Sequence, residues 1–128
     1  MIQEAAETQV TSTLEQIGAC LRALDDKKAE NLRVLHLGPD NSIADYFIIA
    51  TGTSQPHLRA LRNALEKALN EAGVKTLGHD ADMRSGWVVV DAYDVLFHLF
   101  TSDMRQLYNL EGLWKDAKEI PVTQFIAA

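Results

Sequence analysis

The residues of this chain that could do chemistry are few, and the most suggestive group is Asp80-Ala81-Asp82 with His79 beside it. Two carboxylates that alternate along a rigid strand can hold a pair of metal ions for phosphoryl transfer. Here the aspartates lie in the polar segment 78–86, and the sequence offers no clear third carboxylate. We therefore favour a solvated loop at this position, and the metal site remains the alternative.

A second candidate is Gly52-Thr53-Ser54, which stands between an apolar run and a helical pattern. This order is similar to the glycine-serine turn of nucleotidyltransferases, in which a helix N-terminus receives phosphate. The simpler interpretation is a turn whose serine caps a helix, and we favour it. The alternative function is a residual nucleotidyltransferase that uses Ser54 with Asp80 and Asp82.

The histidines and the single cysteine give no recognised catalytic or metal-binding pattern. The spacings of HExxH and Cys/His metal sites are absent, and neither Cys20 nor Ser54 has an evident base to activate it. His57 is expected in the first turn of a helix, and His98 within a sheet. We predict that the protein is not an enzyme and needs no metal or other cofactor.

The part of the chain that holds both tryptophans is expected to position the functional side chains. Two runs rich in β-branched and aromatic residues, 87–90 and 95–100, predict a β-hairpin around the turn-like residues 91–94. A two-residue turn at the centre of this connection would place Trp87 opposite His98.

Both faces of this hairpin are apolar, because side chains alternate along each strand. One face carries Val88, Val90, Val95, Phe97 and Leu99, and the other carries Trp87, Val89, Leu96, His98 and Phe100. An antiparallel hairpin with one wet side would show polar residues on that side. The chain's own helices are expected to cover one face, and either a second helical layer or another molecule the other.

Apolar periodicity predicts further elements along the chain. These are a helix over about 10–26, strands at 32–37 and 46–50, a helix between Ser54 and Gly73, a short extended piece at 74–77, and a last helix that Ser102 caps and that runs toward Trp114. The order predicts a single α/β domain over residues 1–128, a sandwich of helices on a mixed sheet. Residues 1–8 and 116–128 are expected to be flexible or irregular.

Composition narrows the class of partner. The net charge is −6, and the 12 basic residues are scattered, whereas nucleic-acid binding needs cations gathered on one face. No apolar run is long enough for a membrane span, and the N-terminus does not resemble a signal peptide. We expect a cytoplasmic protein without direct contact to nucleic acid or membrane, whose acidic surface suits a basic partner.

An interaction patch is expected where the hairpin meets the last helix. Trp87, Met104 and Tyr108, with Arg105 nearby, are of the types that dominate binding energy at protein interfaces. The alternative is that these aromatic residues only lock the last helix onto the sheet.

Several motifs together resemble the ribosomal silencing factor family, also called RsfS or Iojap. The run DYFIIATGTS from Asp45 to Ser54 is followed three residues later by His57. Three further pieces agree: Trp87 at the start of its strand, Asp94-Val95 with His98, and Arg105 through Tyr108-Asn109-Leu110-Glu111 to Leu113-Trp114. The resemblance covers about residues 10–117. The chain departs from the family in having Tyr93 where glycine is common, and in a longer, more acidic segment 78–86.

The resemblance implies a nucleotidyltransferase-like α/β fold that has lost catalysis. It also implies binding to the large ribosomal subunit through its protein L-fourteen, which keeps the small subunit from joining and represses translation, and a homodimer when the protein is free. By motif, Trp87, Tyr108 and Asn109 would contact the partner. The face assignment of the hairpin adds Leu96 and His98.

Overall fold

The computed structural model describes residues 2–37, 44–74, 78–79, 85–92, 94–109, 112 and 117–126. In this part of the chain, six strands form one mixed sheet. The strands are β1 (Glu30–His36), β2 (Tyr46–Gly52), β3 (Gly78–His79), β4 (Trp87–Ala92), β5 (Val95–Thr101) and β6 (Lys118–Ile120). The helices are α1 (Ile2–Asp26), α2 (Gln55–Glu71) and α3 (Ser102–Tyr108), and a 3-10 turn at Val122–Gln124 follows β6.

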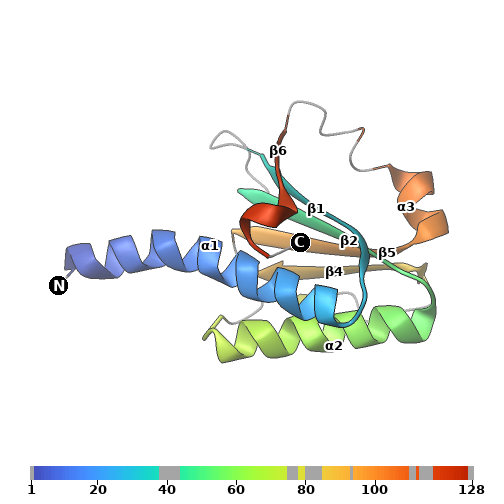
Figure 1. The fold of residues 1–128 in the computed structure, drawn as a ribbon, viewed down its shortest axis with the longest axis horizontal. Helices are drawn as coiled ribbons and strands as arrows, with labels where there is room; N and C mark the ends of the chain where they lie inside the picture. Colours follow the sequence, from blue (N-terminus) through green and yellow to red (C-terminus); the bar gives the residue numbers. More distant parts are fainter. Residues whose placement is uncertain are drawn as a thin grey trace.

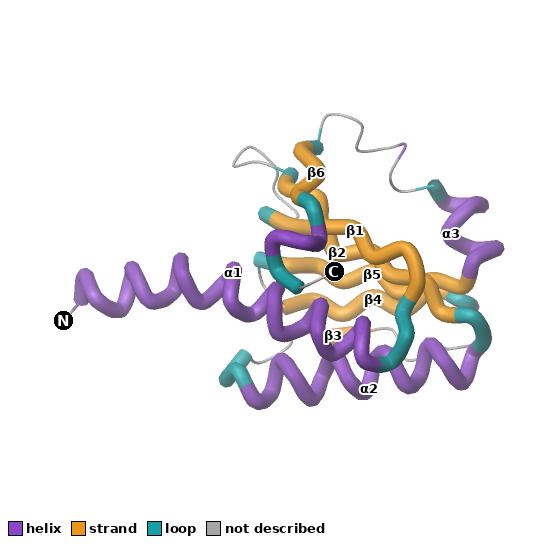
Figure 2. Tube along the Cα trace, viewed as in Figure 1, coloured by secondary structure: helices purple, strands orange, loops and turns teal. Residues whose placement is uncertain are grey.

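The strand order across the sheet is β3-β4-β5-β2-β1-β6 (Figure 1, with β3 labelled in Figure 2). Strands β2 and β5 run parallel, and the other neighbours run antiparallel. The predicted α/β class, with helices on a mixed sheet, is therefore confirmed.

Helices α1 and α2 pack against each other on one face of the sheet, and the N-terminal part of α1 extends beyond it (Figures 1 and 2). The predicted helix between Ser54 and Gly73 is confirmed, and α2 buries one stripe of side chains, Leu58, Leu61, Leu65 and Leu69. The predicted cap is also confirmed, because Ser54 Oγ accepts a hydrogen bond from the backbone N–H of His57 at 3.1 Å. Gly73 follows the helix with a φ of +78°, which glycine adopts without strain.

The face under these helices holds the larger hydrophobic core. The hairpin contributes the predicted set Val88, Val90, Val95, Phe97 and Leu99, and α1 contributes Ile17, Cys20, Leu21 and Leu24. Alternation of the strands and the helical stripe of α1 therefore converge on one apolar layer.

The predicted register of the hairpin is wrong, although its faces are right. Trp87 pairs with Phe100 and not with His98, and Ala92 pairs with Val95, so the two-residue connection lies one position later in the chain. The carbonyl of Asp94 accepts hydrogen bonds from the backbone N–H groups of residues 45 and 46, at 2.9 and 3.1 Å, which ties the connection to the neighbouring β2. A slip of two residues keeps every side chain on its predicted face, because the side-chain period of a strand is two.

The C-terminal residues are more regular than predicted. Strand β6 pairs with β1, with Ile120 opposite Val34, so the prediction of an irregular segment 116–128 is wrong at β6. Glu119 accepts two hydrogen bonds from the Arg33 guanidinium, Nε to Oε2 at 2.9 Å and Nη2 to Oε1 at 2.5 Å. Val122, Phe125 and Ile126 then pack against the core under the helices.

The ends of other elements also differ from the predictions. Helix α1 begins at Ile2, so the prediction of an irregular segment 1–8 is wrong over residues 2–8. Helix α3 ends at Tyr108 because Asn109 adopts the left-handed conformation with a φ of 46°. Ser102 is the first residue of α3, and the capping position belongs to Thr101, whose side chain makes no capping bond. None of the described helices is long and apolar enough to cross a membrane.

The segment 78–86 is described only at its two ends. Its first residues form β3, which pairs with β4, so the prediction of a loop is wrong there. Asp80 and Asp82 lie outside the described residues, as do residues 75–77 of the predicted extended piece.

Candidate functional site

The face of the sheet opposite α1 and α2 holds a smaller apolar cluster. Its buried members are Leu35, Ala44, Phe47, Ile49 and Phe100, and the partly buried Leu37, Trp87, Leu96, Met104 and Ala117 pack against it. Among the described elements, α3 contacts β5 and β2 at the end of the sheet away from the N-terminus (Figure 2). Part of the second hairpin face stays at the surface, since Trp87, Val89 and Leu96 are only partly buried, so the expected second helical layer does not fully cover it among the described residues.

Aromatic rings meet where α3 approaches the hairpin. The Trp87 ring lies 4.6 Å from the Tyr108 ring and 5.1 Å from the Phe100 ring, on which it stacks at 25°. Tyr108 keeps 44% of its surface exposed, and the neighbouring Leu107 keeps 71%. Trp87 therefore joins the buried rings of the sheet to the exposed side chains of α3.

A hollow of about 290 Å³ opens at this point, lined by Ser85, Trp87, Val89, Met104 and Tyr108. Ser85 Oγ accepts a hydrogen bond from the backbone N–H of Trp87 at 3.2 Å and donates to its carbonyl at 3.0 Å. Gly86 adopts a φ of +76°, and a Cβ there would stand 2.7 Å from Met104 Cγ. We call the residues that line this hollow, together with Leu107, the aromatic surface.

His98 lies beneath this surface, only 6% exposed, so it does not have the exposed contact position that its face suggested. Its Nδ1 accepts a hydrogen bond from the indole Nε1–H of Trp87 at 3.2 Å, and the Phe47 ring meets it edge-on at 4.7 Å. Burial lowers the pKa of His98 to about 4, because an apolar site disfavours the charged ring. His98 is therefore neutral at physiological pH, and its hydrogen bond to Trp87 connects it to the surface.

The other predicted contact residues lie in three different places. Trp87, Met104 and Tyr108 come together in the aromatic surface. Leu96 shares their face of the sheet, but it lies four residues from Phe100 along β5, about 13 Å away. Asn109 lines a different hollow on the other side of α3.

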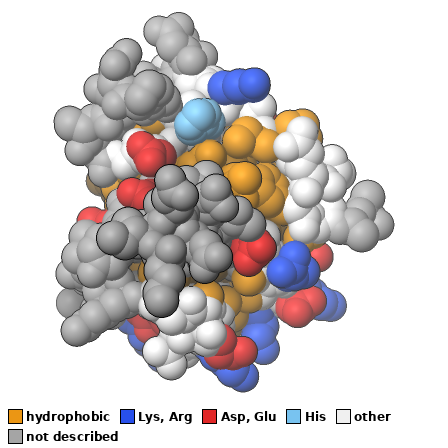
Figure 3. Space-filling view, turned by 90° about the vertical axis from the view of Figure 1, so that its left-hand side faces the viewer, with side chains coloured by type: hydrophobic (Ala, Val, Ile, Leu, Met, Phe, Trp, Pro, Cys, Tyr) orange, Lys and Arg blue, Asp and Glu red, His pale blue; other side chains and the backbone are white. Residues whose placement is uncertain are grey.

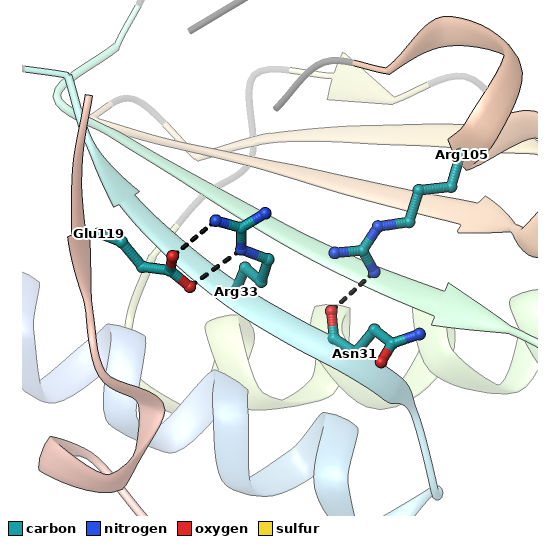
Figure 4. Close-up of polar contacts among 4 residues, drawn as sticks. All are labelled: Asn31, Arg33, Arg105 and Glu119. Carbon is teal, nitrogen blue, oxygen red and sulfur yellow. Dashed lines mark hydrogen bonds and ion pairs between the residues drawn. The ribbon is translucent and has the colours of Figure 1, made fainter. Parts of the chain in front are cut away.

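That second hollow measures about 340 Å³ and is polar, with Asn31, Arg33, Thr51, Ser102, Arg105, Gln106 and Asn109 around it. Arg105 Nη1 donates to the carbonyl of Asn31 at 2.6 Å (Figure 4). The same atom donates to the hydroxyl of Thr51, also at 2.6 Å. These bonds fasten α3 to β1 and β2, just as Arg33 and Glu119 fasten β1 to β6 (Figure 4). Sequence reasoning placed Arg105 near the patch but missed its role as the anchor of α3.

The side chains that could have taken part in catalysis have structural roles where they are described. His57 links three segments: its Nδ1 accepts from the Thr53 N–H at 2.8 Å, and its Nε2 lies 2.7 Å from the carbonyl of Lys27. Ser54 Oγ is occupied as the helix cap. Burial raises the pKa of the Cys20 thiol to about 12, so it is not a poised nucleophile. In the described part of the chain, no three His, Cys, Asp or Glu side chains are grouped as metal ligands.

A further hollow, about 830 Å³, lies between α1 and α2, away from the aromatic surface. Alanines line much of it, and its rim mixes Arg22, Lys27 and Lys67 with Asp26 and Glu71. At the lower right of Figure 3, basic and acidic side chains also lie next to one another. Neither region gathers the cations into the single-sign patch that typically binds nucleic acid.

Comparison with known proteins gives consistent similarities. The sequence profile of the family described as "Ribosomal silencing factor during starvation" matches residues 10–128. The chain is 34% identical over 116 residues to the ribosomal silencing factor RsfS of Halalkalibacterium halodurans, covering 91% of this chain and 99% of that protein. It is 34% identical over 97 residues to the mouse protein named "Mitochondrial assembly of ribosomal large subunit protein 1", covering 71% of this chain and 41% of that protein. A crystal structure of a Chromobacterium violaceum protein superposes with a TM-score of 0.75 at 34% identity, covering 79% of this chain and 84% of that one.

Proposed function

The chain belongs to the ribosomal silencing factor family, and on this premise we propose that it binds the large ribosomal subunit and thereby represses translation. The proposed contact on the subunit is its protein L-fourteen, and the bound chain keeps the small subunit from joining. The observation that carries the proposal is the aromatic surface, an apolar hollow beside exposed Tyr108 and Leu107 on a sheet face that α1 and α2 leave open.

The physical requirements of such a repressor are affinity and bulk. Trp and Tyr carry much of the binding energy at protein interfaces because they bury a large area with few rotatable bonds. The net charge of −6 favours association with a basic ribosomal protein over contact with RNA phosphates. We infer a non-enzymatic regulator that acts in the cytoplasm, since a steric block needs no reactive group.

The proposal is tested by sedimenting the purified protein with isolated large subunits, small subunits and intact ribosomes. The wild type is expected to sediment with free large subunits and to reduce formation of intact ribosomes when small subunits are added. Tyr108→Ala removes an exposed side chain and should weaken large-subunit binding about 30-fold, the effect of a loss of about 2 kcal/mol.

The matched control is Leu14→Ala, which truncates a side chain on α1 that is also 44% exposed. This variant should bind like the wild type, because α1 lies on the other face of the sheet. Failure of the wild type to sediment with any ribosomal particle would overturn the proposed function. Unchanged binding of Tyr108→Ala would show that the aromatic surface is not the binding site. Capture of purified L-fourteen protein tests the proposed contact on the subunit.

We further propose that the free protein forms a homodimer, because an open apolar surface favours a second copy when the subunit is absent. Sedimentation equilibrium should give twice the chain mass of 14.2 kDa at micromolar concentration. A mass of one chain at all concentrations would refute the dimer and leave subunit binding untouched.

A further inference from the structure

We propose that His98 is a positioning residue that fixes the orientation of Trp87 for partner binding; this inference rests on the proposed function. The Trp87 indole has two rotatable side-chain bonds and one polar atom. That atom, Nε1–H, donates to His98 Nδ1 at 3.2 Å. The bond selects one orientation of the ring, with one side stacked on Phe100 and with Tyr108 beside it.

The acceptor is held in place by its surroundings. His98 extends from β5 between Phe47 and Phe100, whose ring centroids lie 4.7 and 6.1 Å from the imidazole. The imidazole must be neutral and carry its proton on Nε2, because Nδ1 accepts the indole N–H. The rings packed around it are uncharged, and His98 itself is only 6% exposed, so few groups compete with the indole N–H for its Nδ1.

This arrangement has a consequence for recognition. An indole whose N–H is engaged inside the protein offers hydrocarbon and a π face to its partner, and no hydrogen-bond donor. The Ser85 hydroxyl is likewise engaged with the Trp87 backbone. The hollow between Trp87, Val89 and Met104 therefore fits an apolar side chain of the ribosomal protein better than a polar one.

Two substitutions with the same number of side-chain non-hydrogen atoms separate positioning from packing. His98→Asn keeps an acceptor, since Asn Oδ1 stands at the same bond separation from Cβ as His Nδ1. His98→Leu also branches at Cγ but has no acceptor. The first readout is the ¹H–¹⁵N resonance of the Trp87 indole, distinguished from that of Trp114 by its absence in Trp87→Phe. The second is affinity for large subunits, with thermal melting to show that each variant folds.

We expect His98→Leu to shift the indole resonance, to speed its exchange with solvent and to weaken large-subunit binding about tenfold. His98→Asn should keep the slow exchange of the indole N–H and an affinity near that of the wild type, although loss of the imidazole ring shifts the resonance in both variants. Exchange in His98→Leu as slow as in the wild type would overturn the hydrogen bond, and faster exchange with unchanged affinity would overturn its role in binding. If the wild type itself does not bind large subunits, the proposed function and the binding role fail together, while the exchange of the indole N–H still decides the hydrogen bond.

Discussion

Acid should lower the free energy of unfolding of this protein, and the burial of His98 sets how much that one residue contributes. In the unfolded chain the imidazole takes up a proton near its ordinary pKa of 6.5, whereas burial holds the pKa in the folded chain at about 4. Between these values the unfolded state binds more protons than the folded state, so the free energy of unfolding rises with pH. The full pKa shift of His98 corresponds to about 3 kcal/mol of unfolding free energy. About 2 kcal/mol of this is lost between pH 7 and pH 5.

The perturbation that isolates this contribution is His98→Asn, which removes the titrating ring and keeps an acceptor for Trp87. Urea unfolding followed by circular dichroism at pH 7 and pH 5 gives the free energy of unfolding of both proteins. The other three histidines and all carboxylates are common to both, so they cancel in the comparison. We expect the wild type to lose about 2 kcal/mol more than the variant on acidification.

Equal losses in the two proteins would refute the reasoning. They would mean that folded His98 takes up its proton as readily as unfolded His98, and hence that its ring reaches water. Measurements stay at or above pH 5 because the carboxylates begin to titrate below it.

Three further substitutions test the packing of the two faces and of the turn at Gly86. Leu65→Ala should lower the free energy of unfolding by about 2 to 5 kcal/mol, because this side chain is buried. Leu107→Ala, at a side chain 71% exposed, should change it by less than about 0.5 kcal/mol. Similar urea midpoints for the two variants would contradict the assigned core. Gly86→Ala should cost about 1 to 3 kcal/mol, because the residue has a φ of +76° and its new Cβ would meet Met104 Cγ at 2.7 Å. The same variant should weaken large-subunit binding through displacement of Met104, and an unaltered thermal midpoint with wild-type affinity would show that this turn is not constrained.

Local chemistry made much of the fold predictable. The start of α2 follows from Ser54, whose hydroxyl reaches a backbone N–H three residues away whatever the rest of the chain does. The two hairpin faces follow from alternation alone, so Trp87 and Val88 were assigned correctly to opposite sides even though the register was wrong by two residues.

Contacts between distant segments account for the errors. The register depends on the carbonyl of Asp94, which binds N–H groups of β2 and is thereby drawn into the sheet. Strand β6 depends on Arg33, which lies 86 residues away from its partner Glu119. No short window of sequence contains either interaction, so composition made the C-terminal segment look irregular.

The candidate site divides in the same way. The sequence by itself determined which residue types are available. Chemical character points to Trp87, Met104 and Tyr108, and the family motifs also contain Trp87 and Tyr108. Only the tertiary structure decided that these three meet around one hollow, that Asn109 faces another, and that His98 lies beneath the surface. The physical reason is that side-chain type sets what a residue is able to bind, whereas burial and hydrogen-bond partners arise only when β4, β5 and α3 pack together.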